Sequence, residues 1–220
     1  MSNSAPADRS HDTRERLLRA SVRVFSELGF EAASTRQLAS QAGVNLAAIP
    51  YHFESKKGLY LAVAAYVADQ IGARLLPTLE GLQPTTDKVA ARAALHRLVQ
   101  AMIRLVAGEP EADCWAGFIL REQAQPTEAF EVLYERTMGR IHETVAQLVG
   151  VISGLPADDP LTRLRSITLT GQVLVFRTSR AGVMRTLGWT EYDAGHLELI
   201  GQVIAEQVDC ILDAVDSDAN

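Results

Sequence analysis

Apolar residues recur along most of this chain at intervals of three and four, which is the spacing of one face of an α-helix. The first such stretch runs from Asp12 to Leu28, places Leu18, Val22 and Phe25 on one face, and is followed by Gly29. Stretches in which apolar and polar residues alternate, as they do in half-buried strands, are nearly absent. The pattern therefore predicts an all-α protein.

Two short helices are predicted after the first one. Ser34 and Gln37 have the spacing of a capping box, in which each side chain bonds the other residue's backbone, so a helix is expected to begin there. Gly43 follows about two turns later and suits a left-handed helix end. Asn45 can cap a third short helix, and Ser55 can begin a fourth.

The remaining chain is predicted to form longer amphipathic helices. The fourth helix extends to about residue 80, and Pro77 is expected to kink or end its last turn. Further helices are predicted over residues 86–107, 113–123, 126–152, 160–187 and 191–215. The two tails, residues 1–11 and 216–220, are expected to be disordered.

The short second and third helices, with a glycine-containing turn between them, have the layout of a helix-turn-helix. In that motif the second helix enters the DNA major groove, which is only about 12 Å wide, and its first residues touch base edges. The stretch from Val44 to Pro50 carries no charge. Its small Ala47 and Ala48 would let the backbone approach the bases, where Leu46 or an alanine can contact a thymine methyl.

Polar residues on either side of this apolar stretch are suited to grip the DNA backbone. The alternative is that three short helices simply form part of an all-α core. The residues predicted to contact DNA are Ser34, Thr35, Arg36, Gln37, Asn45, Leu46, Ala47, Ala48, Tyr51, His52 and Lys56.

Charge changes the picture only for the first part of the chain. The net charge of −6, taken alone, argues against a nucleic-acid partner. Residues 1–60, however, hold eight Lys and Arg against six Asp and Glu, while the remainder holds thirteen against twenty-one. A mildly basic first part is compatible with DNA contact by that part alone.

Composition narrows the class of protein further. Cys114 and Cys210 stand far apart without metal-ligand spacing, and the first residues contain no apolar signal-peptide core. The uncharged apolar run of residues 144–157 is too short to span a bilayer. The sequence therefore predicts a soluble cytoplasmic protein that holds no metal and no cofactor and has no membrane partner.

The segments TRQLASQAGVN and IPYHFESKKGLYLAV resemble the DNA-binding head of the TetR family of transcriptional regulators. Phe53, Ser55, Lys56 and Leu59 fall where that family has its YHF.SK..L junction. With FILREQAQPTEAFEVLYE at residues 118–135, the chain looks like the CecR-like subgroup, which has its own C-terminal domain type.

One residue departs from the family pattern. Pro50 stands where family members commonly carry an aromatic residue. A proline there removes one backbone hydrogen bond and disfavours helical backbone at Ile49. The recognition helix is therefore expected to be shorter or kinked.

The resemblance implies a helix-turn-helix head over residues 12–58, a long linking helix over 55–80, and a larger helical body over 59–215. The body would bind a small effector and form a homodimer. The homodimer would repress transcription by binding a pseudo-palindromic operator. Two successive major grooves of the operator lie roughly 34–36 Å apart. The effector would then release it from the DNA.

The last two long helices are the expected dimer interface, because residues 167–176 are apolar around much of the helix circumference. The alternative is that both helices are buried within a monomer. The residues predicted for the interface are Ile167, Val173, Phe176, Ile200, Val203, Ile204, Val208 and Ile211.

An effector site is expected where aromatic and polar side chains lie on the same helix face, since small-molecule sites are mostly apolar with a few converging polar groups. The alternative is that Arg121 and Glu122 form structural ion pairs that fix the turn at residues 123–126. The residues predicted for the effector site are Trp115, Phe118, Arg121, Glu122, Gln125, Tyr134, His142 and Arg177.

Two other classes of protein compete with the regulator. An enzyme is not expected, because the chain contains no GxSxG, HExxH, phosphate-binding glycine loop or nucleotide fingerprint, and no catalytic residue is assigned. A helical carrier of small molecules or lipids would share the apolar body and would not bind DNA. Salt distinguishes the carrier, because DNA affinity falls steeply as salt rises.

Overall fold

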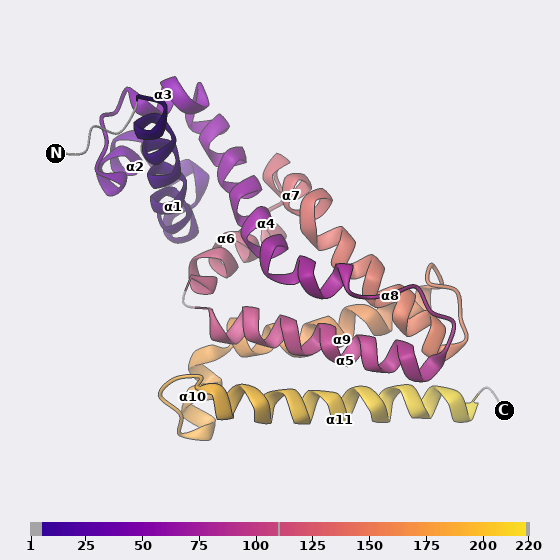
Figure 1. Ribbon diagram of the computed structural model, residues 1–220. Coiled ribbons are helices and arrows are strands. Elements are labelled where there is room, and N and C mark those ends of the chain that lie inside the picture. The colour runs from indigo at the N-terminus through magenta and orange to yellow at the C-terminus, as the bar shows by residue number, and fades with distance from the viewer. Residues whose placement is uncertain (1–5, 110, 219–220) are drawn as a thin grey trace. The chain divides into compact units, whose positions relative to one another are not determined.

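The computed structural model describes residues 6–109 and 111–218, and no strand occurs in these two ranges (Figure 1). The all-α prediction is confirmed. The helices, including two short π-helical segments η1 and η2, are α1 (Pro6–Ala32), α2 (Thr35–Ala42), α3 (Ala48–Phe53), α4 (Lys56–Glu80), α5 (Lys88–Ile103), η1 (Arg104–Gly108), α6 (Ala112–Ala124), α7 (Glu128–Leu133), η2 (Tyr134–Met138), α8 (Gly139–Ser153), α9 (Pro160–Thr178), α10 (Arg180–Leu187) and α11 (Ala194–Asp218).

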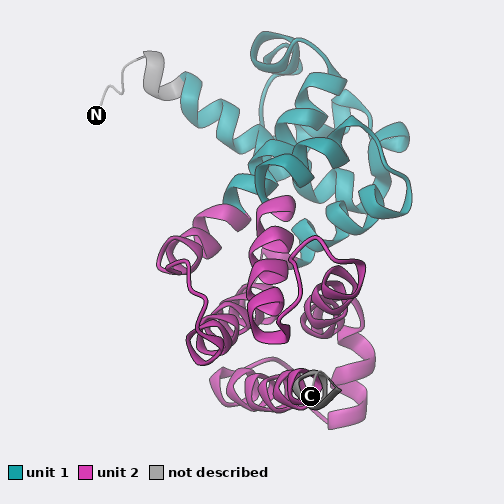
Figure 2. Cartoon of the chain, turned by 90° about the vertical axis from the view of Figure 1, so that its right-hand side faces the viewer, with its two compact units in different colours: residues 1–70, 113–137 teal, residues 71–112, 138–220 magenta. Residues whose placement is uncertain are grey.

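The chain divides into two compact units (Figure 2). Unit 1 combines Met1–Gln70 with Asp113–Thr137, and unit 2 combines Ile71–Ala112 with Met138–Asn220. The units therefore do not follow the expected boundary between a head ending at residue 58 and a body beginning at residue 59. The first part of α4, together with α6 from Asp113 onward, α7 and most of η2, belongs to the same unit as the three head helices.

Helix α1 begins at Pro6, earlier than the Asp12 start expected from periodicity. Proline is favoured in a first helical turn, because its fixed φ suits a helix and its missing N–H has no intrahelical partner there. Residues 6–11 of the expected disordered tail are thus helical, and residues 1–5 lie outside the described part. At the other end, residues 216–218 extend α11, and residues 219–220 are likewise outside it.

Glycine breaks α1 where the sequence predicts a stop. Gly29 has φ 77° and ψ 178°, so the helix is interrupted there and resumes for one short turn to Ala32.

At the end of α4 the helix continues for three residues beyond Pro77, which therefore lies in the last turn as expected.

The later helices match the predicted ranges except at three interruptions. The range 86–107 becomes α5 followed by η1, and the range 126–152 is divided by η2. The range 160–187 breaks at Ser179, whose φ of −112° and ψ of 24° end α9 and precede α10. Asp87 and Asp159 cap α5 and α9 by accepting backbone N–H bonds, which fixes those two starts.

Each unit has its own apolar core. In unit 1 the largest fully buried side chains come from α1 to α4 and from α6 and α7; they are Leu17, Phe25, Leu38, Ile49, Leu59, Phe118 and Leu133. In unit 2 they come mainly from α4, α5 and α8, and α11 packs against α5, α8 and α9.

Helix α4 is long and apolar enough to cross a membrane by length and composition, which the uncharged run of residues 144–157 had not indicated. Core helices of soluble proteins meet the same criteria. Five apolar residues in its first half, Leu59, Val63, Ala64, Val67 and Ala68, are at most 1% exposed. This burial inside the protein accounts for the apolar character of the helix.

Candidate functional site

Helix α2 is fixed at both ends by local hydrogen bonds. The Ser34 hydroxyl accepts the Gln37 backbone N–H at 3.2 Å, and the Gln37 carboxamide oxygen accepts the Ser34 N–H at 2.9 Å, so the predicted capping box is confirmed. Gly43 ends the helix in the left-handed region with φ 63° and ψ 39°, also as predicted.

A side chain that the sequence did not single out also holds the end of α2. Arg16 of α1 donates to the carbonyl oxygens of Ala42 and Gly43 at 2.9 and 2.8 Å. A guanidinium at a helix C-terminus satisfies carbonyls that have no intrahelical donor and complements the helix dipole. Arg16 therefore ties the start of the turn to α1.

We call residues 45–53 the recognition segment. Asn45 does not cap α3 directly, as was expected, because α3 begins only at Ala48. Instead the Asn45 side-chain oxygen accepts the Ala47 N–H at 2.9 Å and caps the turn that leads into the helix. The capping bond predicted for Asn45 is therefore present, but it closes the turn before the six-residue α3 and not the first turn of the helix itself.

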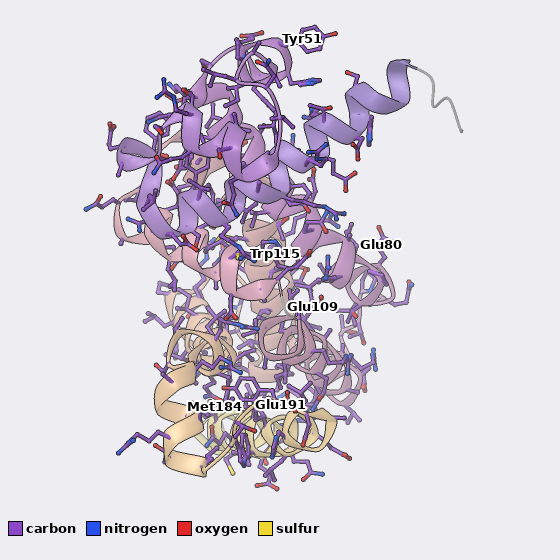
Figure 3. All side chains as sticks on the ribbon, turned by 90° about the vertical axis from the view of Figure 1, so that its left-hand side faces the viewer. Tyr51, Glu80, Glu109, Trp115, Met184 and Glu191 are labelled. Atoms are coloured by element: carbon purple, nitrogen blue, oxygen red, sulfur yellow. The ribbon has the colours of Figure 1, made fainter. Side chains whose placement is uncertain are left out.

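Ile49 and Phe53 anchor the recognition segment to the core, with 1% and 6% of their surface exposed. The intervening residues point outward. Tyr51 is 78% exposed and Leu46 is 46% exposed. Ala47 and Pro50 are also exposed, and Ala48 and His52 are half-buried. Figure 3 shows the Tyr51 side chain projecting away from the ribbon.

Pro50 is accommodated without a kink, although α3 is short, as expected. It is the third residue of α3, where a backbone N–H has no intrahelical acceptor to lose. The Tyr51 N–H still reaches the Ala47 carbonyl at 3.2 Å, and the Glu54 N–H reaches the Pro50 carbonyl at 3.1 Å. The helix therefore forms around the proline.

The junction from α3 to α4 is tight. Glu54 has φ 65°, which is uncommon for a residue with a side chain, and it ends α3 after Phe53. The Ser55 hydroxyl accepts the Gly58 N–H at 3.0 Å at the predicted start of α4. A Cβ at Gly58 would collide with the Phe53 carbonyl oxygen, so glycine is required for this close approach.

Lys56, predicted to contact DNA, has partners inside unit 1. Its ammonium donates to the carbonyl oxygens of Phe30 and Ala33 at 2.6 and 3.0 Å, and lies 3.4 Å from that of Glu31. It also sits 4.3 Å from the centre of the Phe30 ring. Lys56 therefore holds the C-terminal end of α1 against the start of α4.

Three of the residues predicted for an effector site are buried in unit 1. Trp115 is 3% exposed, Phe118 is fully buried and lies 5.0 Å from the Tyr60 ring centre, and Glu122 is 1% exposed. Glu122 accepts hydrogen bonds from the Tyr60 hydroxyl and from the Thr127 N–H and hydroxyl, the latter two at 3.1 and 2.7 Å. Burial raises the pKa of Tyr60, and the bond to Glu122 adds to the increase.

Arg121 belongs to the contact between α6 and α1. Its guanidinium donates to the carbonyl oxygens of Ser26 and Glu27 at 3.2 and 3.0 Å, just before the break in α1. A Cβ at Gly117 would collide with Ser26, so the two helices approach closely there. Both side chains thus have structural hydrogen bonds, but only Glu122 holds the turn after α6, through Thr127, whereas Arg121 bonds α1.

The eight predicted effector residues are divided between the units. Gln125 and Tyr134, both exposed, belong to unit 1 with the four residues just described. His142 and Arg177 belong to unit 2. Burial lowers the pKa of His142. Arg177 donates to the carbonyl oxygens of Val106 and Glu109 and so holds η1 and the residue after it.

The predicted dimer residues fall on two different faces of α9 and α11. Val173, Ile200, Ile204 and Val208 are at most 3% exposed and form part of the core of unit 2. Their assignment to a surface is corrected, because each helix has an inner apolar face in addition to an outer one. Ile167 and Val203 are 58% and 42% exposed, and Phe176 and Ile211 are half-buried.

The outer faces contain apolar residues that the sequence did not single out. On α9 they are Leu164, Leu174 and Val175, and on α11 Leu199. Leu164, Ile167, Leu174 and Val175 follow one another at helical spacing, so they form a stripe along one side of α9. Because both faces of α9 are apolar, the sequence pattern could not show which face points inward without knowing which helices pack against α9.

Two family profiles match the chain. The profile described as bacterial regulatory proteins, tetR family, matches residues 17–63. The profile described as HTH-type transcriptional dual regulator CecR, C-terminal domain, matches residues 91–215. The HTH-type transcriptional dual regulator CecR of Shigella flexneri is 34% identical over 217 residues, which cover 96% of both chains.

Solved structures share the fold at lower identity. AibR in complex with isovaleryl coenzyme A and operator DNA has a TM-score of 0.66 at 17% identity, covering 89% of this chain and 97% of that one. FadR of Bacillus subtilis in complex with stearoyl-CoA has a TM-score of 0.62 at 19% identity, covering 88% and 96%. At this identity the likeness concerns the helical architecture.

Proposed function

We propose that this chain, which belongs to the TetR family of transcriptional regulators and carries the CecR-type C-terminal domain, binds a pseudo-palindromic operator as a homodimer that represses transcription and is released by a small-molecule effector. The observation that carries the proposal is the recognition segment. Leu46, Ala47, Pro50 and Tyr51 of this segment are exposed, while Ile49 and Phe53 are buried and anchor its backbone to the core.

The geometry of unit 1 suits the major groove. A groove about 12 Å wide admits a helix whose outer side chains are small, and Ala47 and Ala48 provide such a surface. The N-terminus of α2, with Thr35 and Arg36, is suited to bind phosphate through backbone N–H groups and side chains. Tyr51, exposed beside the groove-facing residues, is suited to the same backbone.

The homodimer is proposed to form through the outer faces of α9 and α11. Exposed large apolar residues recur on both helices, and a soluble chain rarely leaves such rows uncovered. Ile167 and Val203 keep their predicted role, and Leu164, Leu174 and Leu199 extend it. A two-fold dimer would offer one recognition segment to each of two successive major grooves.

Release by an effector requires that the ligand bind one conformation better than the other. A coupling of about 1–3 kcal/mol would lower operator affinity roughly 5- to 150-fold. Two structural neighbours are bound to acyl-CoA thioesters, so these compounds belong among the first tested. The S. flexneri relative is described as a dual regulator, so a reporter assay should register activation as well as repression.

The test is fluorescence anisotropy of the protein against its own upstream intergenic DNA, with a scrambled duplex as control, over about 50 to 200 mM salt. Specific binding that weakens with salt is expected. Ala48→Glu should abolish it by clash and charge, and Tyr51→Ala should weaken binding to both duplexes. Operator affinity that survives Ala48→Glu would contradict the groove assignment, and a protein that binds neither duplex would favour the carrier.

A further inference from the structure

The outer face of the recognition segment is apolar at the positions suited to touch bases. Leu46 and Ala47, in the turn before α3, lie four residues before Pro50 and Tyr51 respectively, and these two rows of two residues are exposed. The side chains of Leu46, Ala47 and Pro50 can neither donate nor accept a hydrogen bond. They are not core residues, because the buried residues of α3 are Ile49 and Phe53.

Asn45, the amide nearest these rows, is already engaged. Bidentate pairing of Asn with adenine uses both the amide oxygen and the amide nitrogen. Here the oxygen accepts the Ala47 N–H at 2.9 Å, which orients the amide toward its own backbone. Recognition of adenine by this side chain would therefore require the turn before α3 to open.

The major groove offers one apolar feature that distinguishes base pairs, the 5-methyl group of thymine. From this we propose that Leu46 and Pro50 read thymine methyl groups in each half-site, which makes Pro50 a specificity-determining residue. The inference rests on the proposed function and adds which chemical group of the operator is recognised.

Proline suits this task for two physical reasons. Its ring has almost no rotamer freedom, so holding it against a methyl group loses little side-chain entropy. Its position in the first turn of α3 means that no intrahelical hydrogen bond is missing. The residue that departs from the family pattern thus becomes a preformed apolar contact, and the shortness of α3 does not impair it.

In the experiment, deoxyuridine replaces thymidine at one operator position at a time. Each replacement is made in both half-sites. This substitution removes only the methyl group and keeps every hydrogen-bonding atom. Burying one methylene-sized group predicts a loss of about fourfold per half-site at the methyls that are read. Anisotropy titrations at one fixed salt concentration measure the ratio of thymidine to deoxyuridine affinity at each position.

Variants of the protein assign each methyl to a side chain. Pro50→Ala should abolish the thymidine preference at one position, and Leu46→Ala should abolish it at another. Pro84→Ala, the same change at an exposed residue between α4 and α5, should leave every ratio unchanged. If Pro50→Ala does not fold, which circular dichroism detects, Leu46→Ala still tests the assignment, because its turn precedes the helix.

The outcomes separate the inference from the function on which it rests. Specific binding with thymidine ratios near one at all positions would overturn the inference and leave the regulator intact. Ratios that both variants preserve at every position would also overturn it. Absence of specific binding by the unmodified protein would overturn both.

Discussion

Replacing Lys56 by Met separates a structural role from a DNA contact at the same residue. Methionine keeps the length of the apolar stem and removes the ammonium. The ammonium now donates to the carbonyl oxygens of Phe30 and Ala33 at 2.6 and 3.0 Å and faces the Phe30 ring. Without it, the carbonyls at the C-terminal end of α1 lose their donor.

The structure sets the size of the effect. Hydrogen bonds to charged groups contribute about 1.5–3 kcal/mol when buried, and a cation near an exposed ring contributes about 0.5–1 kcal/mol. Lys56 is half-buried, so water can replace part of what is lost. We therefore expect unit 1 to lose about 2 kcal/mol of unfolding free energy.

The two tryptophans allow this loss to be measured in unit 1 alone. Trp115 lies in unit 1 and Trp189 in unit 2, so in a Trp189→Phe background the fluorescence during urea unfolding reports unit 1. Lys57→Met is the matched control. Lys57 makes a surface ion pair with Glu128 at 2.6 Å, in which both side chains are well exposed, and such pairs contribute about 0–1 kcal/mol.

DNA binding provides the opposing readout for the same variant. A lysine that neutralises a phosphate contributes about 0.9 to the slope of log affinity against log salt. If the role of Lys56 is structural, the folded Lys56→Met protein should keep the unmodified protein's slope of log affinity against log salt. Unchanged stability together with a slope reduced by about 0.9 per head would refute the structural role.

Four further changes test other parts of the structure. Ser34→Ala should destabilise unit 1 by about 1 kcal/mol in urea unfolding, because the capping box is lost. Glu122→Ala should cost about 3 kcal/mol and Glu122→Gln less, since alanine leaves the buried Tyr60 hydroxyl without its acceptor; equal effects would contradict this account. Ile167→Glu should give a folded monomer in sedimentation, whereas Ile204→Glu, 2% exposed, should unfold unit 2; a dimer that persists with Ile167→Glu would exclude this face. Burial lowers the pKa of His142, so the folded protein binds that proton more weakly than the unfolded chain, and stability should fall as the pH drops below about 6.5; His142→Gln should lessen that fall, measured as unfolding free energy at several pH values.

Features that depend on neighbours in sequence were predictable. The capping box at Ser34, the left-handed end at Gly43 and the break at Gly29 each follow from one or two residue types and a short spacing. The same holds for the all-α class and for the recognition segment, whose motif is continuous in the chain. Local chemistry determines these features, and tertiary packing leaves them unchanged.

Features that depend on partners distant in the sequence were not predictable. Arg121 and Glu122 share a helix face with aromatic residues, which suggested a ligand site, but their partners lie on α1 and α4, far away in the chain. The inner and outer faces of α9 are both apolar, so periodicity alone could not separate Val173 from Ile167. Lys56 is part of the family junction, and its sequence context does not distinguish a phosphate contact from a bond to α1.

The use of cations in unit 1 bears on how the protein would hold DNA. Of the eight Lys and Arg in residues 1–60, Arg16 and Lys56 bond backbone carbonyls, and Arg19 and Lys57 are paired with Glu15 and Glu128. Positive charge that holds helix ends in place is not available to neutralise phosphates. The head would therefore make fewer ionic contacts than its composition suggests. A larger share of binding then falls to the fit of the recognition segment in the groove, and this fit requires the rigid frame that Arg16 and Lys56 maintain.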